Sequence, residues 1–406
     1  MDTTISAPMN TNNNLHNPHA ARARFRQAVQ STPIIDNHAH PLLKLESVHR
    51  HAFESITSEA RGDALFHNWA SLAHLRAVRQ LAKLHGCEPT WEAVVNASEG
   101  KRTPGEYDEH IGKCFRGIHT VLVDDGLGSA DEVCAYQELD AHVSSPCWRI
   151  VRIERVVEDV VGRYLAEPYK TDEEAGPFDQ FLKEFDSEIG AAVEDPRVAG
   201  FKSVICYRTG LDVPRAVNEA AARKAFDLAM LEQLKVKKSA PFRLSDHTLN
   251  NFFLHRVAKI IRDAPPTFYR KIIQFHTGLG DNDITLAKAS PAHLQEFIRE
   301  YPTLSIVLLH ASYPFMREAA YLATTYQNVF VDVGEVFPCL SRSGQENVIR
   351  EILELAPWTK VLFSTDGHYF PETYYLAQLQ VREALETVRF APDVTCTAAL
   401  TFATRF

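Results

Sequence analysis

The sequence PIIDNHAH, residues 33–40, joins an apolar run to two histidines that are one residue apart. Pro33, Ile34 and Ile35 begin a segment typical of a buried strand, and the polar residues close it. Residues two apart on a strand point to the same side. His38 and His40 are therefore predicted to project to the same side at the end of a strand. There they are either an ordinary pair of polar residues or two ligands of one divalent ion.

Seven further apolar runs follow, separated by stretches with helical spacing. Most are continuously apolar rather than alternating, which is typical of parallel strands buried on both faces. Strands alternating with helices predict an α/β fold, a (β/α)8 TIM barrel. The alternative is a doubly wound open sheet, but no glycine-rich phosphate loop follows the first strand. The signal for a strand is weakest at Arg149–Val156. The seven expected strands are Gly117–Val123, Arg149–Val156, Gly200–Tyr207, Lys271–Thr277, Ser305–His310, Val329–Val333 and Lys360–Thr365.

Two connections, Pro41–Arg116 and Arg208–Arg270, are too long for simple crossovers. Loops that follow barrel strands open onto the active-site face, so long insertions there tend to form a lid or a dimer contact. We expect a flexible N-terminal tail over residues 1–30 and one barrel domain over residues 31–406. A helical insertion at about 42–115 would follow the first strand.

Composition limits the class of protein. The 406 residues include 52 acidic and 43 basic side chains, a net charge of −9, which argues against a nucleic-acid partner. No apolar run approaches the roughly 20 residues that cross a bilayer, and the first thirty residues lack the apolar stretch of a secretory signal. The seven cysteines form no CxxC pair, so buried thiols in a reducing compartment are expected. These features predict a cytoplasmic protein with a small-molecule substrate and no membrane or nucleic-acid partner; a homodimer is the default assembly.

Three later apolar runs also end in residues that bind metals. His276 closes QFHT, His310 closes LLH, and Asp366 follows LFST. The carboxyl ends of parallel barrel strands meet at one mouth, so these side chains should converge with the first histidine pair. Burying such groups without partners costs several kcal/mol. A divalent metal site explains the convergence most simply.

Four segments, IIDNHAHPLL (34–43), GFKSVICYRTGL (200–211), LLHASYPFMREA (308–319) and LFSTDGHYFPETY (362–374), carry a family resemblance. Their ligand pattern resembles the amidohydrolase superfamily of metal-dependent TIM barrels. More narrowly, they are similar to the amidohydrolase half of fluG-like fungal proteins and of plant nodulin–glutamine synthetase fusions. The resemblance covers roughly residues 33–390 and does not extend to glutamine-synthetase chemistry.

The resemblance implies that His38, His40 and Asp366 are metal ligands. It also implies that Asp366 takes a proton from the activated water, as a carboxylate beside a Lewis-acid ion can. Zinc is the expected metal, although the same donors suit Mn, Fe and Co.

The number of ions depends on Lys202. In two-metal members of the superfamily, a carboxylated lysine on the fourth strand bridges the ions, and His276 and His310 would hold the second one. In one-metal members, His276 joins the first ion and His310 acts as an acid/base or polarising residue. Lys202 could otherwise contact a substrate anion or reach solvent. The sequence leaves these arrangements open.

Substrate contacts are expected at the end of the fourth strand. By its register with Lys202, Arg208 would face the barrel mouth and capture a substrate carboxylate, unless it forms an ordinary surface ion pair. Tyr207 could add a hydrogen bond, although the alternating register turns it away from that face. His368 and Glu372 are candidates to orient the ligands. A lid, or simply a helical apolar face, is expected from His67, Trp69, His74 and Arg76.

These features favour a metal-dependent hydrolase that cleaves an amide-type C–N bond of a small carboxylated substrate with a metal-activated water. γ-Glutamyl amides are a candidate class from the fusion context. A metal-dependent non-oxidative decarboxylase on the same barrel is the alternative. A third hypothesis, a non-catalytic binding scaffold, fits less well because the ligand set is complete.

Overall fold

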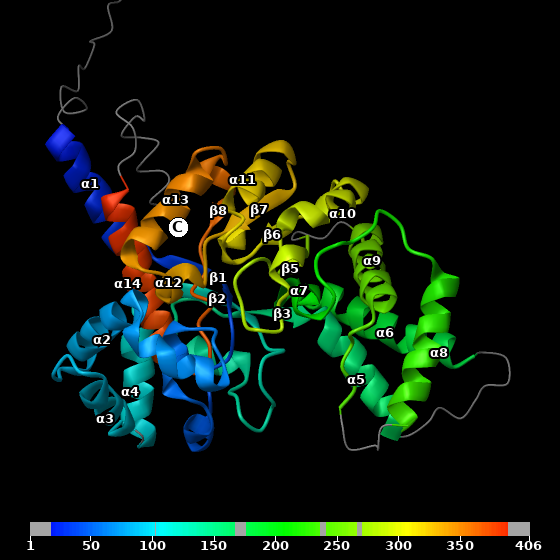
Figure 1. Ribbon diagram of the computed structural model, residues 1–406, viewed down its shortest axis with the longest axis horizontal. Coiled ribbons are helices and arrows are strands. Elements are labelled where there is room, and N and C mark those ends of the chain that lie inside the picture. The colour runs from blue at the N-terminus through cyan, green and yellow to red at the C-terminus, as the bar shows by residue number, and fades with distance from the viewer. Residues whose placement is uncertain (1–17, 102, 167–175, 236–240, 266–269, 389–406) are drawn as a thin grey trace, which may run out of the picture.

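The computed structural model describes residues 18–101, 103–166, 176–235, 241–265 and 270–388 (Figure 1). In these residues, eight strands form one sheet whose spatial order follows the sequence, and every neighbouring pair is parallel. This order confirms the predicted TIM barrel, because a doubly wound sheet reverses its strand order partway. The strands are β1 (Ile34–Ala39), β2 (Ile118–Asp124), β3 (Trp148–Arg152), β4 (Val198–Ser203), β5 (Ile272–Phe275), β6 (Ile306–Leu308), β7 (Val329–Asp332) and β8 (Val361–Leu362).

The barrel closes through the backbone that follows the short β8. The amide of Asp366 donates to the carbonyl of His38 over 3.1 Å, and the amide of His40 donates to the carbonyl of Gly367 over 2.7 Å. These hydrogen bonds join the first and last segments of the barrel side by side. The closure therefore sets the spacing between the histidine pair and Asp366.

Helices cover the outside of the sheet, because the strands are apolar on both faces. Ile306, Val307 and Leu308 of β6 are consecutive and all buried, so one face packs inside the barrel and the other against helices. The helices that follow the later strands are α5 (Ile153–Ala166), α6 (Pro177–Glu194), α7 (Ile205–Arg208), α8 (Glu219–Lys235), α9 (His247–Asp263), α10 (Gln295–Glu300), α11 (Met316–Thr325), α12 (Val336–Cys339), α13 (Arg342–Leu353) and α14 (Pro371–Thr387). Short 3-10 turns are η5 (Tyr136–His142), η6 (Leu286–Lys288), η7 (Pro291–Leu294), η8 (His310–Ser312) and η9 (Trp358–Lys360).

The predicted helical insertion lies between β1 and β2 and gathers beside α14 (Figure 1). Local sequence fixes its longest helix: the Ser71 side chain accepts the His74 amide at 3.1 Å, and Gly86 ends the helix in the left-handed region with φ of 69°. The insertion consists of η2 (Leu45–Arg50), η3 (Phe53–Thr57), η4 (Gly62–Ala70), α2 (Leu72–His85), α3 (Trp91–Glu99) and α4 (Pro104–Cys114).

Two expected strands, Arg149–Val156 and Gly200–Tyr207, include residues that form helices. The third ladder ends at Arg152 and the fourth at Ser203, and helices begin at Ile153 and Ile205. Both isoleucines are buried, so the apolar run continues from strand into helix without a break. Apolar character alone does not separate a buried strand from a buried helical turn.

The expected flexible tail is also corrected over residues 18–31, which form α1 (Pro18–Ser31). Val29 on this helix is buried, and the guanidinium of Arg382 on α14 donates to the carbonyls of Val29 and Thr32. These contacts fasten α1 to the last helix. Residues 1–17 of the expected tail lie outside the described residues. Across the described helices, none combines the length and apolar character needed to cross a bilayer.

Candidate metal centre

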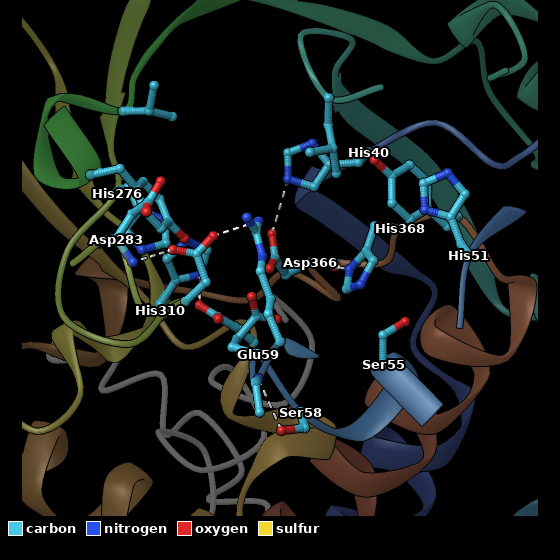
Figure 2. Close-up of a pocket in the computed structure, with 18 of the residues that line it drawn as sticks. His40, His51, Ser55, Ser58, Glu59, His276, Asp283, His310, Asp366 and His368 are labelled. Atoms are coloured by element: carbon cyan, nitrogen blue, oxygen red, sulfur yellow. Dashed lines mark hydrogen bonds and ion pairs between the residues drawn. The ribbon is translucent and has the colours of Figure 1, made fainter. Parts of the chain in front are cut away.

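A cavity of about 620 Å³ opens at the carboxyl ends of the strands, where a TIM barrel places its active site. His40, His276, His310 and Asp366 line it, as Figure 2 shows, and Lys202 reaches it from β4. The strand ends therefore bring together residues that are far apart in the sequence.

The first set of donors combines His38, His40 and Asp366. The Nε2 atoms of His38 and His40 each lie 3.5 Å from Oδ1 of Asp366. This oxygen is buried and accepts no hydrogen bond in the described part of the chain. Two imidazole nitrogens facing an unsatisfied carboxylate oxygen fit a divalent cation, so the residues present suit the metal that the fold implies.

Each histidine of this pair is oriented by a second residue. Nδ1 of His40 lies 3.0 Å from the backbone carbonyl of Asp124, which can only accept a hydrogen bond. Nδ1 of His38 lies 2.8 Å from Oε1 of Gln274, and Gln274 donates through Nε2 to the carbonyl of Asn37 at 2.7 Å. Both Nδ1 atoms therefore carry the proton, and both Nε2 atoms present a lone pair towards Asp366.

A second set of donors, His276, His310 and Glu335, lies in the same cavity, and one donor atom from each residue falls within 4.8 Å of the others. Nδ1 of His310 is 3.1 Å from Oε2 of Glu335. His276 donates from Nε2 to the Leu279 carbonyl at 2.6 Å, so its Nδ1 holds the lone pair. Two neutral nitrogens and a carboxylate again suit a divalent ion.

Glu335 was not predicted as a site residue. It follows β7 directly in the sequence VDVGE, so an acid after the seventh apolar run was the available signal. Its backbone has φ of 57°, and that of His310 has φ of 64°, both in the left-handed region. Such conformations are costly for residues other than glycine and concentrate at functional sites.

Lys202 lies beside the first set. Its Nζ is 3.2 Å from Nε2 of His38, and the residue is 1% exposed. Burial disfavours the ammonium form and lowers the pKa of Lys202 to about 8. A fraction of the side chain is therefore a neutral amine near neutral pH.

The pKa shifts of the histidines and of Asp366 favour the protonation states that bind a cation. Burial lowers the pKa of His38, His276 and His310 well below the usual value, which keeps the imidazoles neutral. Burial alone would raise the pKa of Asp366, but His310, His40 and His38 outweigh it, and the pKa lies well below its usual range. Neutral imidazoles and an ionised carboxylate are the forms that bind metals.

Arg208 and Tyr207 both line the cavity. The expectation that Tyr207 faces away is wrong, because the chain leaves β4 at Ser203 and turns through α7, which replaces strand alternation with a helical turn. The Tyr207 ring lies 4.2 Å from the His276 ring, centroid to centroid. Nη2 of Arg208 forms an ion pair with Glu158 at 3.2 Å.

A lid was one of two alternatives for His67, Trp69, His74 and Arg76, the other being a helical apolar face, and none of the four residues lines the cavity. Trp69 is exposed, His67 is exposed beside it on η4, and Arg76 pairs with Glu383 at 2.6 Å. His74 is buried against Thr57. The insertion instead lines the cavity with an earlier segment that includes Ser55, Ser58 and Glu59 (Figure 2), together with Arg61.

Arg61 fastens this segment across the cavity through an ion pair with Asp281 in the loop after β5. His368, a candidate to orient the ligands, lines the cavity, and its Nδ1 lies 3.0 Å from the backbone carbonyl of Asp366. Glu372 does not approach the metal-binding residues of the cavity. Its carboxylate instead contacts His85 and His110 of the insertion. The helix α14 begins at Pro371 and carries Glu372 away from the mouth.

Comparison with known proteins agrees with this geometry. A family profile described as amidohydrolase matches residues 270–399. Protein fluG of Emericella nidulans is 41% identical over 380 residues, which cover 91% of this chain and 43% of fluG, so the chain spans less than half of that relative. A crystal structure from Lactobacillus casei, whose proposed role is metal-dependent hydrolysis, is 26% identical with a TM-score of 0.77 over 94% of each chain.

A uronate isomerase from Thermotoga maritima shares the fold, with a TM-score of 0.63, 14% identity and 95% coverage of each chain. At that identity the similarity concerns the barrel alone. The fluG similarity, the family profile and the eight-stranded barrel agree with one another. The chain is similar to the amidohydrolase family and to fluG.

Proposed function

We propose that this protein is a metal-dependent hydrolase that cleaves an amide-type C–N bond of a small carboxylated substrate. The observation that carries the proposal is Oδ1 of Asp366, which is buried, accepts no hydrogen bond in the described residues and lies 3.5 Å from both His38 and His40. These three residues would hold the first ion, for which we expect zinc.

A divalent ion supplies Lewis acidity there, polarising a carbonyl and lowering the pKa of water. Asp366 would accept the proton of the attacking water at Oδ2, the carboxylate oxygen that is left free when Oδ1 faces the ion, and return it to the leaving nitrogen. The carbonyl carbon gains the water oxygen as its bond to nitrogen breaks, so each turnover consumes one water and releases a carboxylic acid and an amine.

We propose a two-ion centre in which His276, His310 and Glu335 hold the second ion. Support comes from the clustering of these donors and from Lys202, which is buried beside His38 with a pKa of about 8. The neutral amine can add to carbon dioxide and lose a proton. The resulting carbamate would offer two oxygens, one for each set of donors.

Recognition of a substrate carboxylate is proposed for Arg208. Glu158 contacts one nitrogen, Nη2, of its guanidinium. The planar group carries five N–H donors and can hold a second carboxylate as well. Tyr207 lies beside it on α7 and lines the same cavity, where its hydroxyl could bind the substrate.

Turnover of small carboxylated amides, γ-glutamyl amides among them, in ¹⁸O-labelled water tests this function. Hydrolysis predicts amine release with one ¹⁸O in the acid product, and a loss of about 100- to 10,000-fold in Asp366→Asn. Asp179→Asn, which removes the charge of an exposed ion pair between Asp179 on α6 and Arg223 on α8, is the matched control and should retain activity. Carbon dioxide release without ¹⁸O uptake would identify the decarboxylase instead, and full activity of metal-free protein would refute metal dependence.

A further inference from the structure

A second cluster of metal-binding side chains lies outside the catalytic cavity, between the insertion and the last barrel helix. His85 ends α2, His110 and Cys114 lie one turn apart on α4, and Glu372 lies in the first turn of α14. The three helices lie together in Figure 1. The side chains of His85, His110 and Glu372 are 0%, 3% and 1% exposed, and Cys114 is fully buried. The cluster is therefore sealed from solvent.

One donor atom from each of His85, His110 and Glu372 lies within 4.8 Å of the others, and Cys114 lies beside His110. Nε2 of His85 lies 3.5 Å from Oε1 of Glu372, and Sγ of Cys114 lies 3.8 Å from Nε2 of His110. Tetrahedral zinc bonds of about 2.0–2.3 Å place neighbouring ligand atoms roughly 3.3–3.8 Å apart. The contact between His110 and Glu372, at 2.8 Å, is a hydrogen bond that would open to this spacing.

Hydrogen bonding leaves this cluster incomplete. Nε2 of His85 is buried and faces Glu372 without a hydrogen-bond partner in the described residues. Ser98, His110 and His85 all approach the same atom, Oε1 of Glu372. Unpartnered buried nitrogens are rare, and each one calls for a specific explanation.

We propose that His85, His110, Cys114 and Glu372 form a second metal site, occupied by zinc, that fastens the insertion to α14. Two imidazoles, a thiolate and a carboxylate are zinc ligands, whereas Mg and Ca take oxygen donors. The thiolate and the carboxylate together neutralise a divalent cation, which limits the cost of burying it. This site is independent of the catalytic centre.

Lys101 provides a test of the site, because it opposes cation binding at His85. Its Nζ lies 2.6 Å from Nδ1 of His85. An ammonium there donates to Nδ1 and keeps the imidazole proton on Nε2, where a cation would bind. Lys101 therefore competes with the metal, and Lys101→Met is expected to tighten cation binding at this site by about tenfold or more.

Cobalt(II) loaded into the full chain reports on this site, because thiolate ligation gives a near-ultraviolet charge-transfer band and the catalytic donors include no cysteine. We expect the band in wild type, in His38→Ala and in Lys101→Met, with half-saturation at lower cobalt in the last. Cys114→Ser should lose the band and one zinc per chain by elemental analysis. Cys147→Ser, which removes another fully buried thiol, should keep both.

A wild-type protein without the band would overturn the proposal, as would equal zinc content in Cys114→Ser and Cys147→Ser. If Cys114→Ser does not fold, two other results test the proposal. These are the presence of the band in the wild-type protein and the direction in which Lys101→Met shifts the cobalt concentration at half-saturation. Unchanged or weaker cobalt binding in Lys101→Met would contradict the competition. Neither result depends on catalytic turnover, so the site can fail while the proposed hydrolase stands.

Discussion

Replacing Gln274 with leucine should weaken metal binding at the first set of donors without removing a ligand. Gln274 is fully buried, accepts from Nδ1 of His38 at 2.8 Å and donates to the carbonyl of Asn37 at 2.7 Å. Leucine is similar in size but makes neither hydrogen bond. His38 would then lose the partner that fixes its proton on Nδ1 and its lone pair on Nε2.

The magnitude follows from these two bonds. Each buried polar group left unpaired costs about 1–3 kcal/mol, so the free energy of unfolding should fall by about 2–6 kcal/mol. Loss of a residue that orients a metal ligand typically weakens metal affinity by about 10- to 100-fold. That range corresponds to about 1.4–2.7 kcal/mol of binding free energy.

Competition with a chromophoric chelator would measure the metal Kd, and chemical denaturation of chelated protein would measure stability. Gln380→Leu is the matched control, because Gln380 is also fully buried and bonds to Gln80 and Gln345 rather than to a histidine. It should lose stability and keep the wild-type Kd. Equal Kd values for the two folded variants would refute the reasoning.

Three other outcomes are expected. Lys202→Met, which cannot form a carbamate, should lose one ion per chain relative to wild type by elemental analysis; an unchanged count would exclude the bridge. Burial raises the pKa of Asp36 from 3.8 to about 8, so the folded chain holds a proton that the unfolded chain releases, and this group makes stability fall as pH rises from about 4 to 8. Asp36→Asn should accordingly reduce the loss of stability between pH 5 and 8, measured by chemical denaturation. Chelation should lower the melting temperature and zinc should restore it, since an ion at 100 times its Kd adds about 2.7 kcal/mol.

The sequence by itself determined the barrel and the convergence of His38, His40, His276, His310 and Asp366. Each residue ends an apolar run, and the carboxyl ends of parallel barrel strands must meet at one mouth whatever the details of packing. Because strand geometry is regular, the position of a residue at the end of an apolar run is enough to place it at the barrel mouth.

Only the tertiary structure decided which residues accompany those ligands. Gln274 reaches His38 through the register of β5, and Glu335 reaches His310 through a left-handed turn after β7. Glu372, expected beside Asp366, lies on a helix that carries it to His85 and His110 instead. Loop conformation and pairing between distant segments depend on how the barrel closes, and apolar periodicity does not encode either.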